Sequence, residues 1–230
     1  MSVEPIVNVE QVAKEYRLGT TIVHALNGVD LTVALGEFLA IAGPSGSGKT
    51  TLLNLIGCLE RPTSGRIWIQ GRDTGELTNN VLADVRARQI GFIFQQFNLL
   101  PVLTALENVE YPLLLQPMTP RERRQRARRA LERVGLDRFA RHLPLELSGG
   151  QRQRVAIARA IVVEPILVLA DEPTANLDHA TGQQILELMR ELNRSRGTTF
   201  IFSTHDYKIM ETASRIVQLW DGRTADGKQG

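Results

Sequence analysis

Residues 43–50, with the sequence GPSGSGKT, have the spacing GxxxxGK[ST] that is typical of a loop binding phosphate groups. They follow an apolar run at 38–42 and precede a helical run at 51–59, which is the context in which this motif works. Glycines let backbone amides face phosphate oxygens, and the start of the following helix adds positive potential. Lys49 should reach the β and γ phosphates of a nucleotide, and the Thr50 hydroxyl should bind Mg²⁺. A chance glycine turn with a surface lysine would not explain the strand and the helix on either side.

A second candidate group follows the apolar run at residues 166–170, which ends in Asp171 and Glu172. A carboxylate at the tip of a buried strand can hold Mg²⁺ through water, and we expect this of Asp171. Glu172 lies one residue further out, and we expect it to accept a proton from the water that attacks a γ phosphate, or to polarise that water. Taken alone, such a pair is often an exposed turn. The phosphate loop in the same chain favours the catalytic interpretation.

Strand patterns in the sequence indicate how these two groups could be brought together. Apolar runs at 166–170 and 199–202 are typical of strands covered on both faces, as in a parallel α/β sheet. Short β-like runs separated by glycine-bearing turns predict a strand-rich beginning of the chain. These runs lie at residues 6–9, 29–33, 38–42 and 66–69.

The chain is expected to fold as one domain, residues 1–230, because 230 residues with 43% hydrophobic content suit one sizeable core. Residues 96–164 are mostly helical in pattern and lie between strand-rich flanks, so we predict an inserted helical subdomain there. The catalytic core would then consist of residues 1–95 and 165–230.

Charge and apolar content argue against several classes of protein. The net charge of +2 gives no global reason to expect nucleic acid as a partner. The single cysteine, Cys58, permits no intrachain disulfide, which suits a reducing compartment, and its apolar neighbours suggest burial. The N-terminus lacks the basic start of a secretory signal. Residues 155–170 are broken by Arg159, Glu164 and Pro165, well short of the roughly 20 apolar residues that span a bilayer. Any membrane span would belong to another chain.

An arginine-rich helix is predicted inside the helical segment. Thr119 is placed as its N-cap, Pro120 at its first position and Glu122 to close a capping box, and the pattern continues to Gly135. Seven arginines between residues 121 and 133 surround a narrow apolar face. We interpret them as a solvated surface. The alternative is contact with anionic lipid or nucleic acid, although no aromatic residues interleave to stack on bases.

Residues 147–151, LSGGQ, run into the helical pattern at 152–163 and resemble the signature motif of the ABC family. A guanine-reading NKxD segment, which a GTPase would need, is absent, and a small-molecule kinase would not need a second glycine-rich helix start. Ser148 and the amides of Gly149 and Gly150 would form an anion site that cannot reach the chain's own phosphate loop. A serine cap followed by a glycine turn is the alternative, and it leaves the rest of the run LSGGQRQRVAIARA unexplained.

The ABC resemblance covers nearly the whole chain and implies a fold and further site residues. The implied fold is an α/β P-loop NTPase (RecA-like) core with an N-terminal antiparallel β part and an inserted α-helical subdomain. Tyr16 resembles the aromatic residue that stacks on adenine, although a place in the strand core is equally open. Gln95, rather than its neighbour Gln96, resembles the glutamine that senses the γ phosphate. Asp178 resembles the D-loop aspartate, and His205 resembles the switch histidine.

ATP and Mg²⁺ are the ligands that the resemblance implies, and the residues fall into three groups. The catalytic residues are Lys49, Gln95, Glu172 and His205. The residues for Mg²⁺ are Thr50, Gln95 and Asp171. The residues for ATP are Tyr16, Gly43, Pro44, Ser45, Gly46, Ser47, Gly48, Lys49, Thr50, Thr51, Ser148, Gly149, Gly150, Gln151 and Asp178.

The same resemblance implies partners. In this family the LSGGQ of one subunit closes over the γ phosphate held by the other, which implies a head-to-tail homodimer. The segments GFIFQQFNLLP and DEPTANLD resemble the lipoprotein-release and macrolide-exporter branch. That branch implies a separately encoded membrane permease, a cytoplasmic position at the inner face of the cell membrane, and export or extracytoplasmic release. The alternatives are a soluble ABC ATPase acting on nucleic acid or ribosomes, and a regulatory cassette without activity. The first would need a second cassette or a long coiled coil, and the second would be expected to lack Glu172 or His205.

Overall fold

The computed structural model describes residues 5–206 and 210–225, which are built around two β-sheets. In the larger sheet all neighbouring strands are parallel except the pair at one edge, β10 and β9. In order across this sheet, its strands are β10 (Arg223–Ala225), β9 (Arg215–Trp220), β3 (Phe38–Ala42), β8 (Thr199–Thr204), β7 (Leu167–Ala170) and β6 (Ile90–Ile93).

Strand β3 separates two hydrophobic cores because successive side chains of a strand point to opposite faces. Phe38 and Ala40 belong to one core, whereas Leu39 and Ile41 belong to the other. Every residue of β3, β7 and β8 is buried. Burial on both faces explains the continuous apolar runs that predicted these three strands.

The smaller sheet is antiparallel and confirms the predicted strand-rich beginning of the chain. Its first two strands are much longer than the runs at 6–9 and 29–33 that predicted them. The outer half of their hairpin is exposed in the first four residues of the second strand and mostly only partly buried in the first strand, so no alternation of apolar and polar residues marks it. In order, the strands are β2 (Thr21–Val33), β1 (Val7–Leu18), β4 (Ser64–Ile69) and β5 (Arg72–Asp73).

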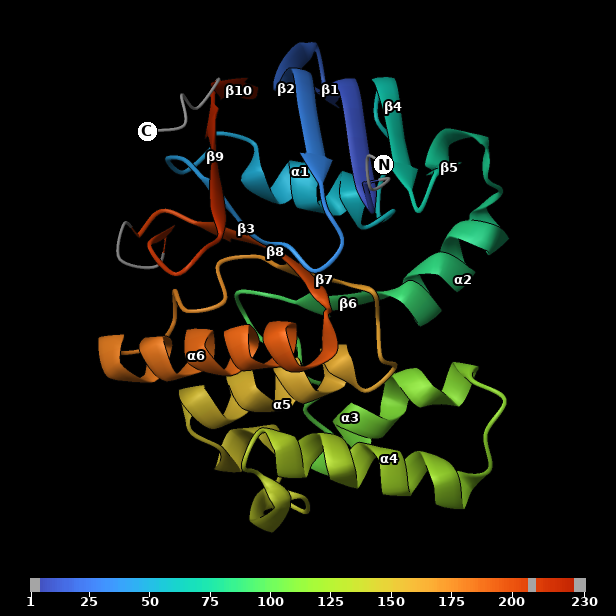
Figure 1. Cartoon of the computed structure of the whole chain (residues 1–230), viewed down its shortest axis with the longest axis vertical. Helices are drawn as coiled ribbons and strands as arrows, with labels where there is room; N and C mark the ends of the chain where they lie inside the picture. Colours follow the sequence, from blue (N-terminus) through green and yellow to red (C-terminus); the bar gives the residue numbers. More distant parts are fainter. Residues whose placement is uncertain (1–4, 207–209, 226–230) are drawn as a thin grey trace.

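Helix α1 (Lys49–Ile56) lies between the two sheets (Figure 1), and its buried leucines share one core with residues of β1, β2, β3 and β8. Cys58, just after this helix, is buried as predicted. The other face of the larger sheet is covered by α5 (Gly149–Ile161) and α6 (His179–Arg196), which contribute to the second core. Because β3 leads through residues 43–48 into α1, the first turn of α1 lies near the carboxyl ends of the parallel strands.

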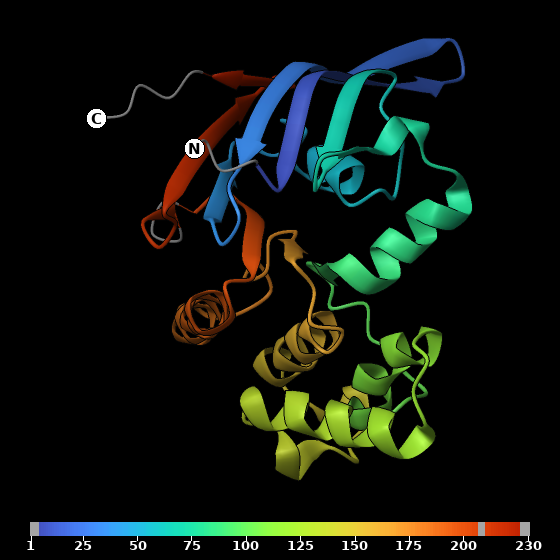
Figure 2. The ribbon, with the colours of Figure 1, turned by 45° about the vertical axis from the view of Figure 1, so that its right-hand side comes forward.

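Residues between β6 and β7 form helices, as predicted, and Figure 2 shows them at the end of the molecule opposite the antiparallel sheet. The arginine-rich helix begins at Pro120 with the predicted capping box of Thr119 and Glu122, and it ends at Arg133, before Gly135. None of the described helices is long and apolar enough to cross a membrane. The remaining helical elements are η1 (Thr74–Glu76), α2 (Asn79–Gln89), α3 (Ala105–Glu110), η2 (Tyr111–Leu115), α4 (Pro120–Arg133), η3 (Asp137–Phe139) and η4 (Pro144–Glu146).

Candidate functional site

The phosphate loop, residues 43–50, is shaped by close contacts that only glycine permits. A Cβ atom on Gly43 would lie 2.2 Å from the Leu219 carbonyl oxygen, and one on Gly48 would lie 2.5 Å from the Ala25 carbonyl oxygen. Gly48 also has a φ of 102° and begins α1 with no hydrogen bond from a capping side chain. The first amides of α1 therefore have no side-chain acceptor and remain available to a ligand.

Two buried polar side chains belong to this loop. Ser47 is 3% exposed, and among the described residues its Oγ has no hydrogen-bond partner. Lys49 is 5% exposed, and its Nζ donates to the carbonyl oxygens of Gly43 at 2.7 Å and of Pro44 at 2.8 Å. A buried ammonium and an unpaired hydroxyl beside uncapped helix amides are the donors that a phosphate group requires. The loop therefore fits the phosphates of a nucleotide.

Thr50, Asp171 and Ser203 form a hydrogen-bonded cluster next to the loop. The Thr50 hydroxyl lies 2.9 Å from Oδ2 and 3.1 Å from Oδ1 of Asp171. The Ser203 hydroxyl donates to Asp171 Oδ1 at 2.7 Å. A hydroxyl and a carboxylate in contact are oxygen ligands of the kind that Mg²⁺ takes alongside phosphate oxygens and water. The chemistry of these groups fits a Mg²⁺ ion held by Thr50 and Asp171.

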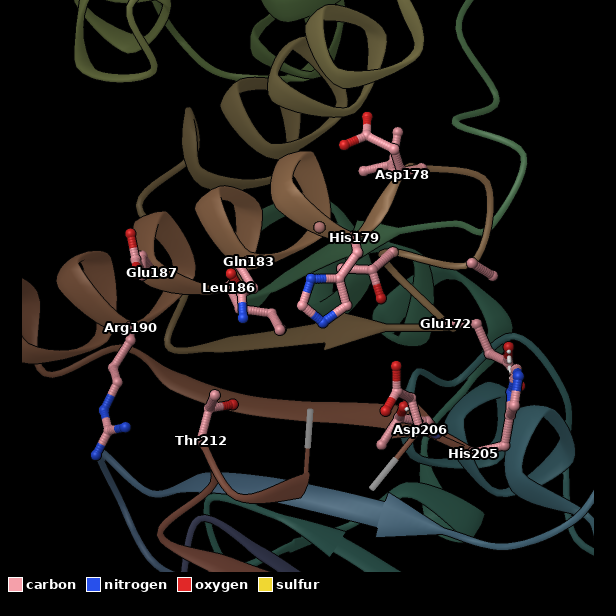
Figure 3. Close-up of a pocket in the computed structure, with 15 residues that line it drawn as sticks. Glu172, Asp178, His179, Gln183, Leu186, Glu187, Arg190, His205, Asp206 and Thr212 are labelled. Carbon is pink, nitrogen blue, oxygen red and sulfur yellow. Dashed lines mark hydrogen bonds and ion pairs between the residues drawn. The ribbon is translucent and has the colours of Figure 1, made fainter. Parts of the chain in front are cut away.

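Glu172 and His205 are paired at the tips of neighbouring strands (Figure 3). His205 Nδ1 lies 2.9 Å from Oε2 and 3.0 Å from Oε1 of Glu172, and Lys49 Nζ lies 3.9 Å from Oε1. Glu172 has a φ of 44°, a conformation that residues other than glycine rarely adopt. Its backbone amide donates to the Ser203 hydroxyl at 2.8 Å, which holds this unusual turn in place.

A cavity of about 510 Å³ opens beside this pair, lined by α6 and the segment that precedes it and by residues 204–206 and 212. Figure 3 shows Glu172 and His205 at one end of the cavity, with Asp178 and His179 at the start of α6. Asp178 caps α6 by accepting a hydrogen bond from the Thr181 amide at 3.0 Å, and hydrogen bonds from the Thr181 side chain and amide lower the pKa of Asp178. The predicted D-loop aspartate is thus a helix cap, and it lines the same cavity as Glu172.

Tyr16 lies on β1 near the start of α1, and its position in the strand is only partly buried. Its hydroxyl donates to Glu60 Oε2 at 2.8 Å, and Lys14 Nζ lies 5.0 Å from the centre of its ring. Burial raises the pKa of Tyr16, and Thr51 also forms a side-chain hydrogen bond with it. Burial alone would raise the pKa of Glu60, but hydrogen bonds from Tyr16, Lys14 and Asn54 outweigh it and lower that pKa. The Tyr16 ring is therefore fixed in position close to the phosphate loop.

The signature residues lie at the start of α5, away from the phosphate loop. The Ser148 hydroxyl accepts from the Gln151 amide at 3.3 Å, and Gln151 Oε1 accepts from the Ser148 amide at 2.9 Å. A Cβ atom on Gly150 would lie 2.5 Å from Thr181 Cγ2, so this glycine allows α5 to pack closely against α6. Within residues 5–206 and 210–225, no hydrogen bond or ion pair joins Ser148 or Gln151 to residues 43–50.

Gln95 follows β6 as predicted, but its exposed side chain makes no hydrogen bond within the described part of the chain. Its backbone oxygen accepts from Asn176 Nδ2 at 2.7 Å, which joins this loop to the segment after Glu172. Sequence reasoning missed Asn176, and it also missed Gln153 of α5. The fully buried Gln153 donates from Nε2 to the Pro173 carbonyl oxygen at 2.7 Å, one residue from Glu172.

Ser203 and Gln153 are the two missed residues that touch the candidate catalytic segment directly. Each is a polar residue in an otherwise apolar buried position, Ser203 in β8 and Gln153 on the core face of α5. Buried polar groups are normally hydrogen-bonded. Their type and position were therefore a signal that each has a specific partner, although the partner itself becomes visible only in the fold.

Residues 26–175 match the protein family described as ABC transporter. The chain is 48% identical over 221 residues to MJ0796, an uncharacterized ABC transporter ATP-binding protein of Methanocaldococcus jannaschii, and the match covers 94% of each protein. It is 47% identical to the lipoprotein-releasing system ATP-binding protein LolD 1 of Rhodopseudomonas palustris, with 96% of this chain and 98% of that protein covered. It is 47% identical to the macrolide export ATP-binding/permease protein MacB of Hyphomonas neptunium, where the match covers 95% of this chain and 34% of that protein.

The fold is also similar to a solved structure of MJ0796 in a dimeric, post-hydrolysis state bound to ADP and Pi. The TM-score is 0.88 at 48% sequence identity, with 95% of this chain and 96% of that chain covered. The predicted α/β P-loop NTPase fold and the predicted resemblance to the lipoprotein-release and macrolide-exporter branch are confirmed, and a cassette acting on nucleic acid or ribosomes is not favoured. The chain therefore belongs to the ABC transporter family, as the ATP-binding and ATP-hydrolysing part of a transporter that uses ATP with Mg²⁺.

Proposed function

We propose that residues 43–51 bind the phosphates of ATP, with Tyr16 packing on the adenine ring. The uncapped start of α1, the buried Lys49 ammonium and the unpaired Ser47 hydroxyl support this role. Thr50, Gln95 and Asp171 are the proposed residues for Mg²⁺, which when bound would neutralise charge on the β and γ phosphates. The hydrogen bond between Thr50 and Asp171 supports the assignment of these two residues.

Glu172 is the proposed general base, accepting a proton from the water that attacks the γ phosphate. The observation that carries this proposal is the convergence of Lys49, Glu172 and His205 from three distant parts of the chain. His205 and Lys49 lie at hydrogen-bond and ion-pair distance from the carboxylate, so both limit its orientation. Once ATP is bound, we expect Lys49 to exchange its two loop carbonyls for phosphate oxygens and His205 to contact the γ phosphate.

Ser148, Gly149, Gly150 and Gln151 are proposed to complete the site of a second copy of the chain, and Asp178 to line the same interface. Within the described part of the chain, no hydrogen bond or ion pair joins Ser148 or Gln151 to the chain's own phosphate loop, and the ABC cassette MJ0796 forms a dimer. The proposed arrangement is head-to-tail with C₂ symmetry, so that each phosphate loop faces the partner's signature. The γ phosphate would then lie between two positive helix ends and offset their repulsion.

A permease is the proposed membrane partner, docking on an apolar surface of the helical segment and holding the ATPase at the inner face of the membrane. Val102 is 82% exposed and Leu115 is 70% exposed, so two large apolar side chains of this segment face solvent. A hollow of about 220 Å³ is lined by Leu115 together with Phe92 and Phe94. We propose residues 96–164 as the helical subdomain that carries this surface, with residues 1–95 and 165–230 as the catalytic core.

The proposal is tested with Glu172→Gln, which keeps the size of the side chain and removes the base. Turnover should fall by on the order of 10² or more, the usual effect of losing a positioned acid or base. ATP should still bind, and light scattering with Mg-ATP should show a dimer that contains two nucleotides. Turnover close to that of the wild type would refute the role of Glu172.

Ser148→Arg in the Glu172→Gln protein is the matched test of the interface. The bulky side chain should abolish the dimer but leave ATP binding to the protomer unchanged, because Ser148 lies outside the protomer's own phosphate site. If ATP binding is lost along with the dimer, the start of α5 belongs to the same protomer's site and the head-to-tail proposal is wrong.

A further inference from the structure

Arginines of α4 line two different hollows that differ in how their charge is balanced: Arg124 and Arg128 line one, and Arg126, Arg129 and Arg133 line the other. On one flank, Glu164 forms an ion pair with Arg126 at 2.9 Å and another with Arg196 of α6 at 3.1 Å. Arg126 also donates to the Val162 carbonyl oxygen at 2.7 Å. The two contacts of Arg126 fasten α4 to the segment that follows α5, and the ion pair of Arg196 fastens α6 to the same segment. The arginines that form these contacts have a structural role.

The other flank has no such balance. Arg124 and Arg128, one turn apart on α4, line a hollow of about 450 Å³ together with Arg138 and Arg141 from the loop after it. Among the described residues, none of these four arginines lies at ion-pair or hydrogen-bond distance from a partner. Hydrogen bonds from Thr104 lower the pKa of Glu107, and the nearby charge of Arg124 lowers it further. Glu132 and Asp137 also line the hollow, and four guanidinium groups against two carboxylates leave it with a charge of +2.

The floor of the hollow is apolar and firmly held. Leu106 and Leu131 are buried there, and Ala140 is partly buried. The loop that carries Arg138 and Arg141 is fastened to the start of α3 by two backbone hydrogen bonds, Ala105 N to His142 O at 2.8 Å and Leu106 N to Ala140 O at 3.0 Å. The arginines therefore surround a preformed concave surface instead of projecting from a mobile loop.

We propose that this hollow, defined by Arg124, Arg128, Arg138 and Arg141, binds the phosphate group of an anionic phospholipid. Guanidinium groups match phosphate oxygens in geometry and in charge, and four unpaired ones around a single hollow repel each other unless an anion is present. The apolar floor suits the less polar part of a headgroup and its glycerol. A soluble phosphate compound would supply the same chemistry, and the experiment separates the two sources.

The choice of lipid rests on the proposed permease docking surface. That surface includes Val102, only a few residues before α3, and the hollow is built on the first residues of α3. If the permease covers Val102, the hollow lies close to the permease, on the part of the ATPase that we expect to be nearest the membrane. Each arginine near an anionic membrane surface contributes about fivefold to binding, so two together contribute on the order of 30-fold.

Vesicle binding by the full chain tests the proposal, with a control drawn from the same helix. Arg124→Gln with Arg128→Gln removes two charges from the hollow, and Arg129→Gln with Arg133→Gln removes two charges from the other flank. Binding is measured by sedimentation with vesicles of phosphatidylglycerol and phosphatidylcholine, and with phosphatidylcholine alone. The first pair should weaken binding to the anionic vesicles by roughly 30-fold, and the control pair by only a few fold. An equal loss in both pairs would mean that the helix acts only as a diffuse positive charge, and it would overturn the proposal.

Titration of inorganic phosphate into the same proteins decides whether the bound phosphate group belongs to a lipid or to a soluble compound. Phosphate bound at the phosphate loop is common to all of them, so a difference between the two pairs reports on the hollow alone. If phosphate binding is lost only in the first pair and anionic vesicles are not preferred, the phosphate site stands and its ligand is soluble. If neither vesicles nor phosphate distinguish the pairs, but the first pair loses binding to a permease in detergent, the ligand is an acidic protein segment and the proposal is wrong.

ATPase activity and the Glu172→Gln dimer should be unchanged in both pairs of variants. Failure of the lipid proposal is therefore distinct from failure of the proposed function.

Discussion

Helices α1 and α5 both begin in glycine-rich segments, yet only the backbone amides at the start of α5 have hydrogen-bond acceptors from capping side chains. Helix α1 starts at Gly48 with a φ of 102° and has no side-chain cap. Helix α5 starts at Ser148, where the serine hydroxyl and the Gln151 side chain satisfy each other's backbone amides. The first helix start is unfinished without a ligand, whereas the second is already complete within the chain.

This difference suits two different tasks. An uncapped start with a buried lysine can take up phosphate in a single protomer, because its donors have no better partners. A capped start keeps a fixed shape and still has the serine hydroxyl hydrogen and the amides of Gly149 and Gly150 to offer. We interpret α5 as a rigid surface presented to a second copy of the chain.

Lys49→Ala should have the largest effect. It removes a buried ammonium whose charge-assisted hydrogen bonds are worth about 1.5–3 kcal/mol, so the affinity for Mg-ATP should fall by roughly 10- to 100-fold. Isothermal titration of the isolated protomer measures this. Thermal unfolding serves as the control, since Lys49 also holds the carbonyl oxygens of Gly43 and Pro44. Unchanged affinity in a folded variant would mean that α1 is not the phosphate-binding helix.

Ser203→Ala should have the next largest effect, because the Ser203 hydroxyl is hydrogen-bonded to both Asp171 and Glu172. Without its hydroxyl, the Asp171 carboxylate loses one anchor and the Glu172 amide is left unpaired. Turnover should fall by about tenfold, with a higher Mg²⁺ requirement and little change in ATP affinity. Ser203→Cys keeps the volume but makes only weak hydrogen bonds, so it should resemble Ser203→Ala. Normal turnover and Mg²⁺ dependence in both variants would show that Ser203 only fills space.

The elements that carry the candidate site were predictable because their signals are local. Strands β3, β7 and β8 are buried on both faces, and the phosphate loop is a continuous run of eight residues. The outer half of the hairpin of β1 and β2 was not predictable, since exposed strand residues lack a two-residue alternation. Strands β9 and β10 were missed for a similar reason, since the exposed face of β9 carries the apolar Ile216 and Trp220, so its residues do not alternate between apolar and polar, and β10 is only three residues long.

The contacts of the site depend on the fold and could be predicted only as far as the chain order implied them. That Thr50 and Asp171 would meet followed from the two motifs, but Ser203 is 32 residues beyond Asp171 and belongs to no motif. Gln153 illustrates the same limit, because its hydrogen bond to Pro173 requires α5 to pack against the segment after β7. The division of the α4 arginines into a paired flank and an unpaired flank also depends on Glu164 and Arg196, which lie outside that helix.

Ser148→Ala should have the smallest effect, and it tests whether the serine is more than a cap. Loss of the N-cap hydroxyl should cost about 1 kcal/mol of unfolding free energy, which lowers the Tm by roughly 2–4 °C in a chain of this size. Thr119→Ala is the matched control, because Thr119 and Glu122 form the same capping box at the start of α4. Both variants should lose similar stability and bind ATP normally as protomers. In the Glu172→Gln background, however, only Ser148→Ala should weaken the ATP-dependent dimer, since only its hydroxyl would face the partner's γ phosphate. Dimers of equal strength would show that Ser148 completes its own helix and nothing else.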